Sequence, residues 1–503
     1  MALQVVGFKY EGDKCESDLS LSTQQRSAAV IRKWLIGGGI LIVAGYLGMA
    51  GYIYMADNAR SKALISEEEI ITNDAIPSAG NTTLTNQQVS NLFYQKGCDY
   101  CHTSSASLPF YAVIPGVKQL MDYDIQQGSQ YFSLEPTLLA IKENSALPEA
   151  DLAKIESAIA REQMPPQRFE VLHWSSGINA EERNQILDWV KSHRAEHFPS
   201  NSSSDMKHLT LQPLPDALPV DGKKVALGAR LFHDPRLSSD NTISCASCHL
   251  LTKGGVDNLA TSTGVDGQKG GINAPTVFNA VFNVNQFWDG RAVDLQQQAG
   301  GPPLNPVEMA SASWDDIINK LQQDTQLTQE FVQVYPQGYS EQTITDAIAE
   351  FEKTLTTPNS PFDRYLKGDV NALTTSQKNG LVLFQKNKCD TCHVGKNLGG
   401  QSYDLMGLKA NYFADRPKEL TADDHGRFNV TQAPRDMHRF KTPGLRNIAL
   451  TAPYFHDAQA EDLIQAVEMM LKYQVGTNLP PQDVLDIVAF LESLTGEYTP
   501  YQE

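Results

Sequence analysis

Residues 241–271 read NTISCASCHLLTKGGVDNLATSTGVDGQKGG, and they contain the motif that decides the fold. Cys245, Cys248 and His249 spell Cys-x-x-Cys-His, the attachment signature of a c-type haem. In such a site two thioethers hold the porphyrin, and the histidine binds one axial face of the iron. The ligand on the other face decides the function, because an electron carrier closes that face with a second strong ligand and a catalyst leaves it open.

The same signature occurs three times, in NLFYQKGCDYCH, RLFHDPRLSSDNTISCASCH and VLFQKNKCDTCH, each time with Leu-Phe upstream. The two outer copies supply Cys98, Cys101 and His102, and Cys389, Cys392 and His393. A single Cys-x-x-Cys pair can serve zinc or redox chemistry. Three copies, each followed directly by histidine, predict three covalently bound haem c groups in three cytochrome-c-like units.

The composition limits the class of protein. The chain of 503 residues is long enough for about three or four domains. Its 41 basic and 59 acidic side chains give a net charge of −18, which argues against nucleic acid as a partner. Six of the seven cysteines belong to the haem motifs, so a disulfide framework is not expected. The seventh, Cys15, is predicted to be a free thiol in the cytoplasm.

Residues 34–55, WLIGGGILIVAGYLGMAGYIYM, carry no charge and would span ~33 Å as a helix, enough to cross a bilayer core. A cleaved signal peptide and a buried core helix are the alternatives, and an uncleaved anchor is favoured because a signal segment is shorter. Basic residues precede the segment and Glu67 to Glu69 follow it, which places the N-terminus inside. We expect a single-pass protein of the bacterial inner membrane with its haem domains in the periplasm.

The fold class is predicted to be mainly α, with long loops around the haems, because stretches such as EERNQILDWVKSH and PQDVLDIVAFLESL have helical apolar spacing. The expected boundaries are a cytoplasmic N-terminus at 1–33, the anchor at 34–55, a polar tether at 56–83, a first haem c domain at 84–197, a linker at 198–208, a second haem domain at 209–370 and a third at 371–503.

The distal ligand of the first haem is expected to be Met164, in REQMPPQRF. Prolines stiffen this loop and can present the thioether to the iron opposite His102. A lone methionine is more often core filler. The rival ligands are Met121, His173, His193 and His197.

For the third haem, opposite His393, the helical spacing of EDLIQAVEMMLKY puts Met470 on one face with Leu463 and Val467. Met469 faces elsewhere, and Met406 and Met437 lie in sequence typical of loops. On spacing alone Met470 could equally be a core residue. A histidine–methionine pair raises the potential of a haem, which suits an electron reservoir.

The middle haem has no obvious sixth ligand. After His249 the next histidine is His425, and the next methionine is Met309. Lys253 and Lys269 could bind iron, but a lysine is usually a solvated charge. The sequence therefore predicts an open face on the middle iron.

Four segments, TKGGVDNLATSTG, NAPTVFNAVFNVNQFWDGRAVDLQQQA, PLNPVEM and LRNIALTAPYFHD, closely resemble the bacterial dihaem cytochrome c peroxidases. The resemblance covers about residues 209–503. With the anchor and the additional N-terminal haem, the whole chain resembles the trihaem, membrane-bound quinol peroxidases of that family. It implies reduction of hydrogen peroxide, with a peroxidatic haem domain at 209–370 and a high-potential electron-transfer haem domain at 371–503.

The resemblance also implies roles for single residues. Met470 falls on the family's distal methionine, Gln298 and Glu308 on the pair beside the peroxide-binding iron, and Trp288 on the tryptophan between the two haems. Asn273, Thr451 and Pro453 fall on the family's calcium site, where oxygen ligands suit the ion. Many dihaem members carry a distal histidine in the loop after the peroxidatic haem, and this chain has Val265 there.

This pattern suggests separate catalytic roles for two of these residues. We expect Glu308 to move the proton that O–O cleavage requires and Gln298 to orient the peroxide. Composition alone would make Glu308 a solvated loop residue and Trp288 an aromatic of the core. The expected donor is membrane quinol, with a soluble cytochrome c or cupredoxin as the alternative.

Two other classes of function are compatible with parts of the sequence. A pure electron-transfer cytochrome would need all three irons to be six-coordinate. The protein-modifying dihaem oxidases carry tyrosine in place of the distal methionine, so Met470 argues against them. A monomer and a homodimer both remain open.

Overall fold

The computed structural model describes residues 40–41, 43–65 and 83–501. By its internal contacts the chain forms two compact units: unit 1 comprises residues 1–73, 93–97 and 165–178, and unit 2 comprises 74–92, 98–164 and 179–503. The predicted cytoplasmic segment 1–33 and most of the tether lie outside the described residues. So do residues 34–39 and 42 of the predicted anchor.

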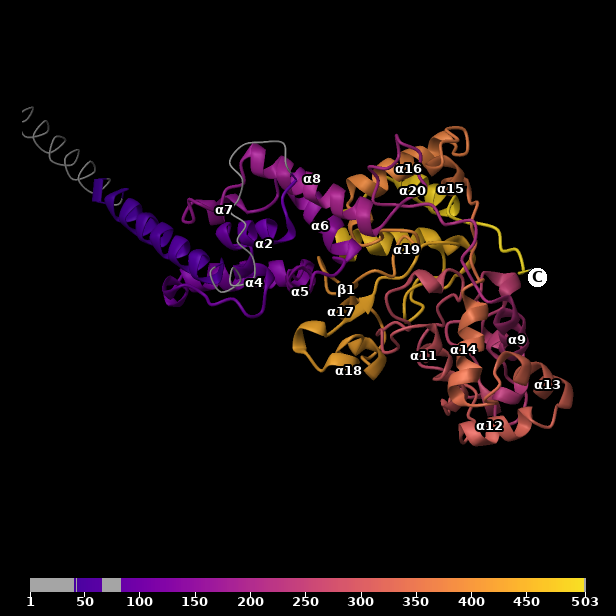
Figure 1. The fold of residues 1–503 in the computed structure, drawn as a ribbon. Helices are drawn as coiled ribbons and strands as arrows, with labels where there is room; N and C mark the ends of the chain where they lie inside the picture. The colour runs from indigo at the N-terminus through magenta and orange to yellow at the C-terminus, as the bar shows by residue number, and fades with distance from the viewer. Residues whose placement is uncertain (1–39, 42, 66–82, 502–503) are drawn as a thin grey trace, which may run out of the picture. The chain divides into compact units, whose positions relative to one another are not determined.

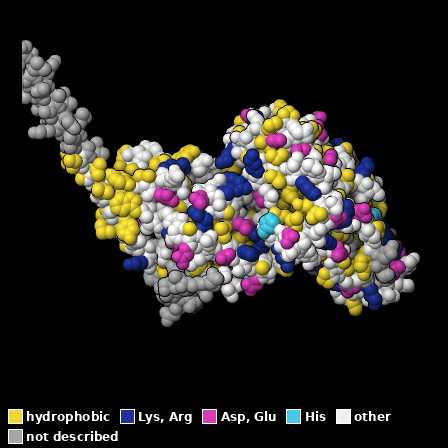
Figure 2. Space-filling view, turned by 90° about the horizontal axis from the view of Figure 1, so that it is seen from above, with side chains coloured by type: hydrophobic (Ala, Val, Ile, Leu, Met, Phe, Trp, Pro, Cys, Tyr) yellow, Lys and Arg dark blue, Asp and Glu magenta, His cyan; other side chains and the backbone are white. Residues whose placement is uncertain are grey.

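Unit 1 contains a helix over residues 40–41 and 43–65 and the short helix α7, Gln167–Glu170. Tyr46 donates a hydrogen bond from its hydroxyl to the Val171 carbonyl at 2.7 Å, and His173 Nδ1 lies 2.7 Å from Asp57 Oδ2. Large apolar side chains on this helix are exposed, and Figure 2 shows them as a yellow patch. Within the ranges that the structure describes, no helix combines the length and apolarity that crossing a membrane requires.

Unit 2 is mainly helical, which confirms the mainly α part of the predicted fold class. The helices around the first haem motif are α2 (Asn86–Gln95, of which 93–95 belong to unit 1), α3 (Asp99–His102), α4 (Val117–Tyr131), α5 (Glu135–Glu143), α6 (Glu149–Ala160) and α8 (Ala180–His197). Those around the second are α9 (Gly222–Phe232), α10 (Cys245–Cys248), α11 (Leu295–Ala299), α12 (Trp314–Leu321), α13 (Thr325–Val334), α14 (Glu341–Glu352) and α15 (Pro361–Leu366). Those around the third are α16 (Thr375–Lys386), α17 (Tyr412–Asp415), α18 (Phe428–Thr431), α19 (Leu463–Met470) and α20 (Pro481–Glu492).

Side-chain caps fix where many of these helices begin. Asn179 accepts from the Glu182 amide at 2.9 Å at the start of α8, while the Glu182 carboxylate accepts from the Asn179 amide. Thr374 and Gln377 form the same reciprocal capping box at the start of α16. Each box satisfies two backbone donors that a helix end leaves free.

The C-terminal part of the chain repeats one helix crossing, α9 on α14 and α16 on α20 (Figure 1). A Cβ atom on Gly228 would lie 1.8 Å from the Ala347 carbonyl oxygen, and one on Gly380 would lie 1.9 Å from that of Asp486. Only glycine permits backbones to approach so closely. Both glycines stand four residues before the Phe of the Leu-Phe repeat. The recurring sequence signature therefore marks a helix crossing as well as a haem site.

Each crossing anchors a hydrophobic core. Phe232 packs on Phe351 and Phe384 packs on Phe490, both with ring centroids 5.3 Å apart. Among the described residues the named strands are β1 (Tyr403–Leu405) and β2 (Arg439–Lys441), an antiparallel pair. The remaining described chain forms loops and short helical turns. The motif residues lie on short helical segments, α3, α10 and the turn Cys389–Thr391, and loops connect these segments to the helical frame.

Candidate haem-binding and active site

The three motif histidines share one local geometry. In each case Nδ1 lies within hydrogen-bond distance of a backbone carbonyl oxygen: His102 at 2.9 Å from Phe132, His249 at 3.2 Å from Gly255 and His393 at 3.1 Å from Leu398. Burial lowers the pKa of all three imidazoles, which favours the neutral form. A neutral imidazole that donates from Nδ1 presents its Nε2 lone pair to a metal. All three motifs are therefore built to supply an axial ligand.

In the part of the chain that the structure describes, the six motif cysteines form no disulfide, as covalent haem attachment requires. The third motif opens onto a cavity of about 440 Å³, within the range of cofactor pockets. Cys389, Cys392 and His393 line this cavity, and Met470 lines it as well. These residues fit a haem c with histidine and methionine as axial ligands.

The geometry separates Met470 from Met406, which also lines the cavity. Gln474 donates a hydrogen bond from Nε2 to the Met406 sulfur at 3.4 Å, so a thioether lone pair of Met406 is engaged. Met470 is the last residue of α19, directly before a π-helical turn over Leu471–Val475. Such turns are frequent at functional sites, because they redirect the side chains beside them.

Glu308 lies beside the middle motif. Burial raises the pKa of the Cys245 and Cys248 thiols, and the negative charge of Glu308 adds to both shifts. The Glu308 carboxyl is partly buried and accepts a hydrogen bond from Asn305 Nδ2 at 2.6 Å. Burial raises its pKa, while the charge of Arg291 and the Asn305 bond oppose the rise. A carboxyl held in this way can exchange a proton nearer to neutral pH than a solvated one.

The loop with Val265 is fixed to the backbone of Glu308. The Val265 amide donates to the Glu308 carbonyl at 2.8 Å, and the Val265 side chain is buried. A Cβ atom on Gly264 would lie 2.3 Å from the same carbonyl oxygen, so glycine is required there. An isolated bridge between Thr263 and Lys269 closes the loop. The place that carries histidine in many dihaem relatives is therefore a closed turn with an apolar side chain.

The other residues that could cap the middle iron are engaged elsewhere or solvated. Lys253 and Lys269 are exposed, and Lys269 donates to the Thr263 hydroxyl. Met309 is 3% exposed and belongs to the hydrophobic core of the domain. Gln298 lies on α11, partly buried, and its carbonyl accepts from the Gly301 amide.

Trp288 belongs to the wall of the third-haem cavity. Its indole Nε1 donates to the Asn273 carbonyl at 2.8 Å, and its own carbonyl accepts from the Lys441 amide. Its ring meets Phe440 and His456 edge-on, with centroids 6.5 and 6.3 Å away. The indole is thus held by a hydrogen bond and by aromatic contacts on two sides.

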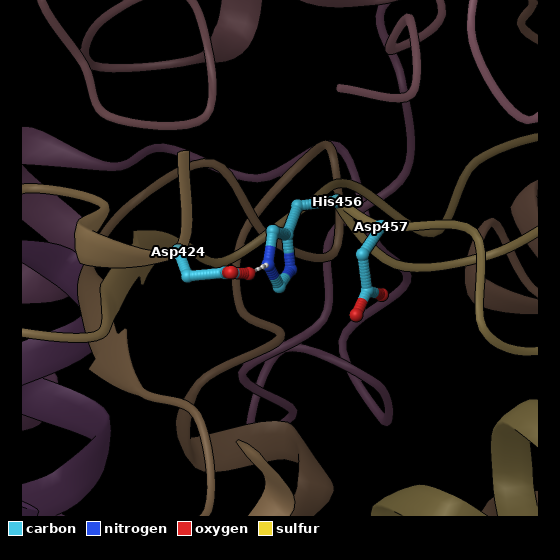
Figure 3. Close-up of side chains that lie close together, drawn as sticks. All are labelled: Asp424, His456 and Asp457. Carbon is cyan, nitrogen blue, oxygen red and sulfur yellow. Dashed lines mark hydrogen bonds and ion pairs between the residues drawn. The ribbon is translucent and has the colours of Figure 1, made fainter. Parts of the chain in front are cut away.

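A charged cluster behind Trp288 was not predicted from the sequence. The His456 imidazole lies 2.9 Å from Asp424 Oδ1, and Figure 3 shows these two side chains facing each other with Asp457 beside them. Arg416 donates to both carboxylates, at 2.6 Å to Asp457. The guanidinium supplies the positive charge that a metal ion would bring, so the cluster is a buried ion-pair network that supports His456 against Trp288. The segment PYFHD contains His456 and Asp457, but no local pattern in the sequence singles out Asp424 or Arg416.

The predicted calcium ligands, like Trp288, lie in the wall of the third-motif cavity. Asn273, Thr451 and Pro453 all line the cavity wall. Asn273 donates from Nδ2 to the Leu259 carbonyl at 2.9 Å, which turns its amide oxygen the other way. In the part of the chain that the structure describes, no donor bonds to the carbonyls of Thr451 and Pro453. Three uncharged hard oxygens fit calcium.

At the first motif, Met164 lies in the loop after α6 and is 36% exposed. Two rivals are occupied: His193 Nε2 accepts from the Leu147 amide at 3.0 Å, and His173 faces Asp57 within unit 1. Burial lowers the pKa of His193 to about 4 and keeps it neutral. Met121 is partly exposed and His197 is exposed.

A helical frame with Cys-x-x-Cys-His motifs, histidines oriented for iron and a cofactor-sized cavity defines a c-type haem protein. The model of the family "Di-haem cytochrome c peroxidase" matches residues 222–371, and that of "Haem-binding domain" matches 54–192. Cytochrome c peroxidase Ccp of Escherichia coli (strain K12) is 54% identical over 459 residues, which cover 91% of this chain and 96% of that protein.

Two further similarities each cover a little more than half of this chain. Cytochrome c551 peroxidase of Pseudomonas aeruginosa is 44% identical over 302 residues, 58% of this chain and 86% of that protein. A crystal structure of a MauG-like protein associated with microbial copper homeostasis gives a TM-score of 0.51 at 29% identity, over 56% of this chain and 95% of that one. The chain belongs to the dihaem cytochrome c peroxidase family, and it is a haem oxidoreductase that acts on hydrogen peroxide.

Proposed function

We propose that this protein is a trihaem quinol peroxidase of the bacterial inner membrane, which reduces hydrogen peroxide to water in the periplasm. One observation supports a haem count of three. His102, His249 and His393 share the same geometry, each with Nδ1 on a backbone carbonyl. The first motif is thus prepared for iron in the same way as the other two.

The middle motif is the proposed site of peroxide reduction. A haem held by Cys245, Cys248 and His249 supplies an iron that can bind and reduce peroxide. Glu308, held by Asn305, takes the proton from the inner peroxide oxygen and delivers it to the departing one. Gln298 orients the peroxide by hydrogen bonding. Val265 and the closed loop around it leave the distal side free of a strong ligand.

The third motif is the proposed electron reservoir: His393 and Met470 would hold its haem together with Cys389 and Cys392, and His102 and Met164 would hold the first haem. Trp288, held by its bond to Asn273, would lie on the electron path between the middle and third sites. Calcium on Asn273, Thr451 and Pro453 would fix the Asn273 backbone, whose carbonyl accepts the hydrogen bond from the Trp288 indole.

The membrane donor is inferred from the uncharged residues 34–55 and from the exposed apolar side chains that the helix over 40–41 and 43–65 carries within that segment. A protein held at the membrane surface works beside the quinol pool. The test is steady-state peroxide reduction with quinol alone and then with a small cytochrome c alone. Turnover with quinol supports the proposal. Turnover with the cytochrome alone would assign a soluble donor.

A further inference from the structure

Residues 128–134 contact the first haem motif through their backbone. The Phe132 carbonyl accepts from His102 Nδ1 at 2.9 Å, and the Leu134 amide donates to the His102 carbonyl at 2.7 Å. A Cβ atom on Gly128 would lie 2.9 Å from the Cys101 carbonyl oxygen. The end of α4 and the turn after it are therefore packed directly on the predicted first haem ligand.

The same segment reaches the third haem motif. Gln130 and Tyr131 line the cavity that contains Cys392, His393 and Met470. The Tyr131 hydroxyl lies 3.5 Å from the hydroxyl of Thr391, the residue between the two cysteines of that motif. Tyr131 is thus one residue away from the hydrogen-bond partner of His102 and stands in the wall of the third site.

A partly buried arginine holds this segment in place from the side of the third motif. Arg439, in β2, donates from Nη2 to the carbonyls of Ser129 and Gln130 at 2.8 and 2.9 Å. These carbonyls lie at the C-terminus of α4, where positive charge is favoured.

A second group of contacts fixes α6 against the same motif. Lys154 forms a 2.6 Å ion pair with Asp404, and the two side chains are 6% and 20% exposed. Ser402 and Thr442 each donate to the other oxygen of Asp404 at 2.6 Å. Ala150 and Ala153 pack on Val394, the residue after His393. Breaking a pair of this kind leaves a buried charge without a partner, so the arrangement is fixed.

We propose that residues 128–134 are the electron bridge between the first and third haems, with Tyr131 as the side chain that closes the gap. The inference rests on the proposed function, because it needs a haem on the first motif. One electron passes from the ferrous first haem to the ferric third haem, which oxidises the former and reduces the latter. No bond forms or breaks. Burial raises the pKa of Tyr131, so the phenol keeps its proton and the transfer moves no proton.

The experiment uses the holoprotein with the first and third haems reduced. One equivalent of peroxide oxidises the third site, and stopped-flow absorbance then follows the loss of ferrous first haem as it refills the third. Tyr131→Leu should slow this phase by roughly tenfold, or about 1.4 kcal/mol of barrier, with the potentials of both haems unchanged in a spectroelectrochemical titration. Tyr131→Phe keeps the ring and should stay within about threefold of the wild type.

The matched control is Tyr123→Leu, which changes a 52% exposed tyrosine of the same helix and should leave the phase unaltered. An unchanged rate in Tyr131→Leu, or equal slowing in Tyr123→Leu, overturns the bridge. A haem count of two in the wild type, with the first motif empty, overturns both the bridge and the proposed trihaem function. A count of three with an unchanged rate overturns the bridge alone.

Discussion

Replacing Glu308 by alanine tests the assignment of proton transfer. The carboxyl is partly buried beside Cys245 and Cys248, and one oxygen is held at 2.6 Å from Asn305 Nδ2. A positioned general base and acid contributes on the order of 10²–10⁴-fold, so Glu308→Ala should lower kcat by that factor, about 2.7–5.4 kcal/mol. The assay is steady-state peroxide reduction with an artificial donor, together with haem content and cyanide binding at the middle haem, which should both be unchanged.

The pH dependence of kcat/KM provides a second test of Glu308. The Asn305 hydrogen bond lowers the pKa of Glu308, so Asn305→Ala should raise that pKa. The base form then appears only at higher pH, and the acidic limb of kcat/KM should move upward in pH. Glu461→Ala, at an exposed glutamate, is the control and should behave as the wild type. A loss of less than about threefold in Glu308→Ala would assign proton transfer to another group or to water.

Three further outcomes are expected. Met470→His should lower the potential of the third haem, because imidazole favours ferric iron more than thioether does, and a titration in which only Met406→His lowers it would overturn the assignment. Deleting residues 1–56 behind another export signal should leave haem content and peroxide reduction with an artificial donor intact while quinol turnover falls; unchanged quinol turnover would remove the role of the anchor. Burial raises the pKa of Glu352 to about 8, and its Oε2 has no partner among the described residues. The raised pKa contributes to the free energy of unfolding fully below about pH 4.5, and this contribution is lost as pH rises through 8. As pH rises from 6 to 9, the free energy of unfolding of Glu352→Gln should therefore increase by about 2.5 kcal/mol relative to that of the wild type, measured by denaturant unfolding. A difference between the two proteins that does not depend on pH would contradict this.

The sequence predicted the features that depend on residues close together along the chain. The Cys-x-x-Cys-His motifs need only short spacing, and the helical apolar period predicted a mainly α fold. The period of α19 also placed Met470 on a defined face, but it could not show that Gln474 engages the sulfur of Met406. The resemblance supplied the roles of Glu308, Gln298 and Trp288, and these remain predictions.

The missing parts are contacts between distant segments. Lys154 and Asp404 are 250 residues apart, and neither lies in a pattern that singles it out. The ion pairs of Arg416 with Asp424 and Asp457 likewise join loops without a period. The closed turn at Val265 depends on a glycine that meets the Glu308 carbonyl, a contact that spacing along the chain does not encode.

The distal side of the middle haem is expected to be open in the resting enzyme. Val265 cannot bind iron, Lys253 and Lys269 are exposed, and Met309 is packed in the core. Electron paramagnetic resonance of the fully oxidised protein at neutral pH, followed by addition of cyanide, tests this directly. We expect one high-spin or water-ligated haem beside two low-spin haems, and cyanide binding without a lag. Three low-spin haems, with cyanide binding only after partial reduction, would contradict it.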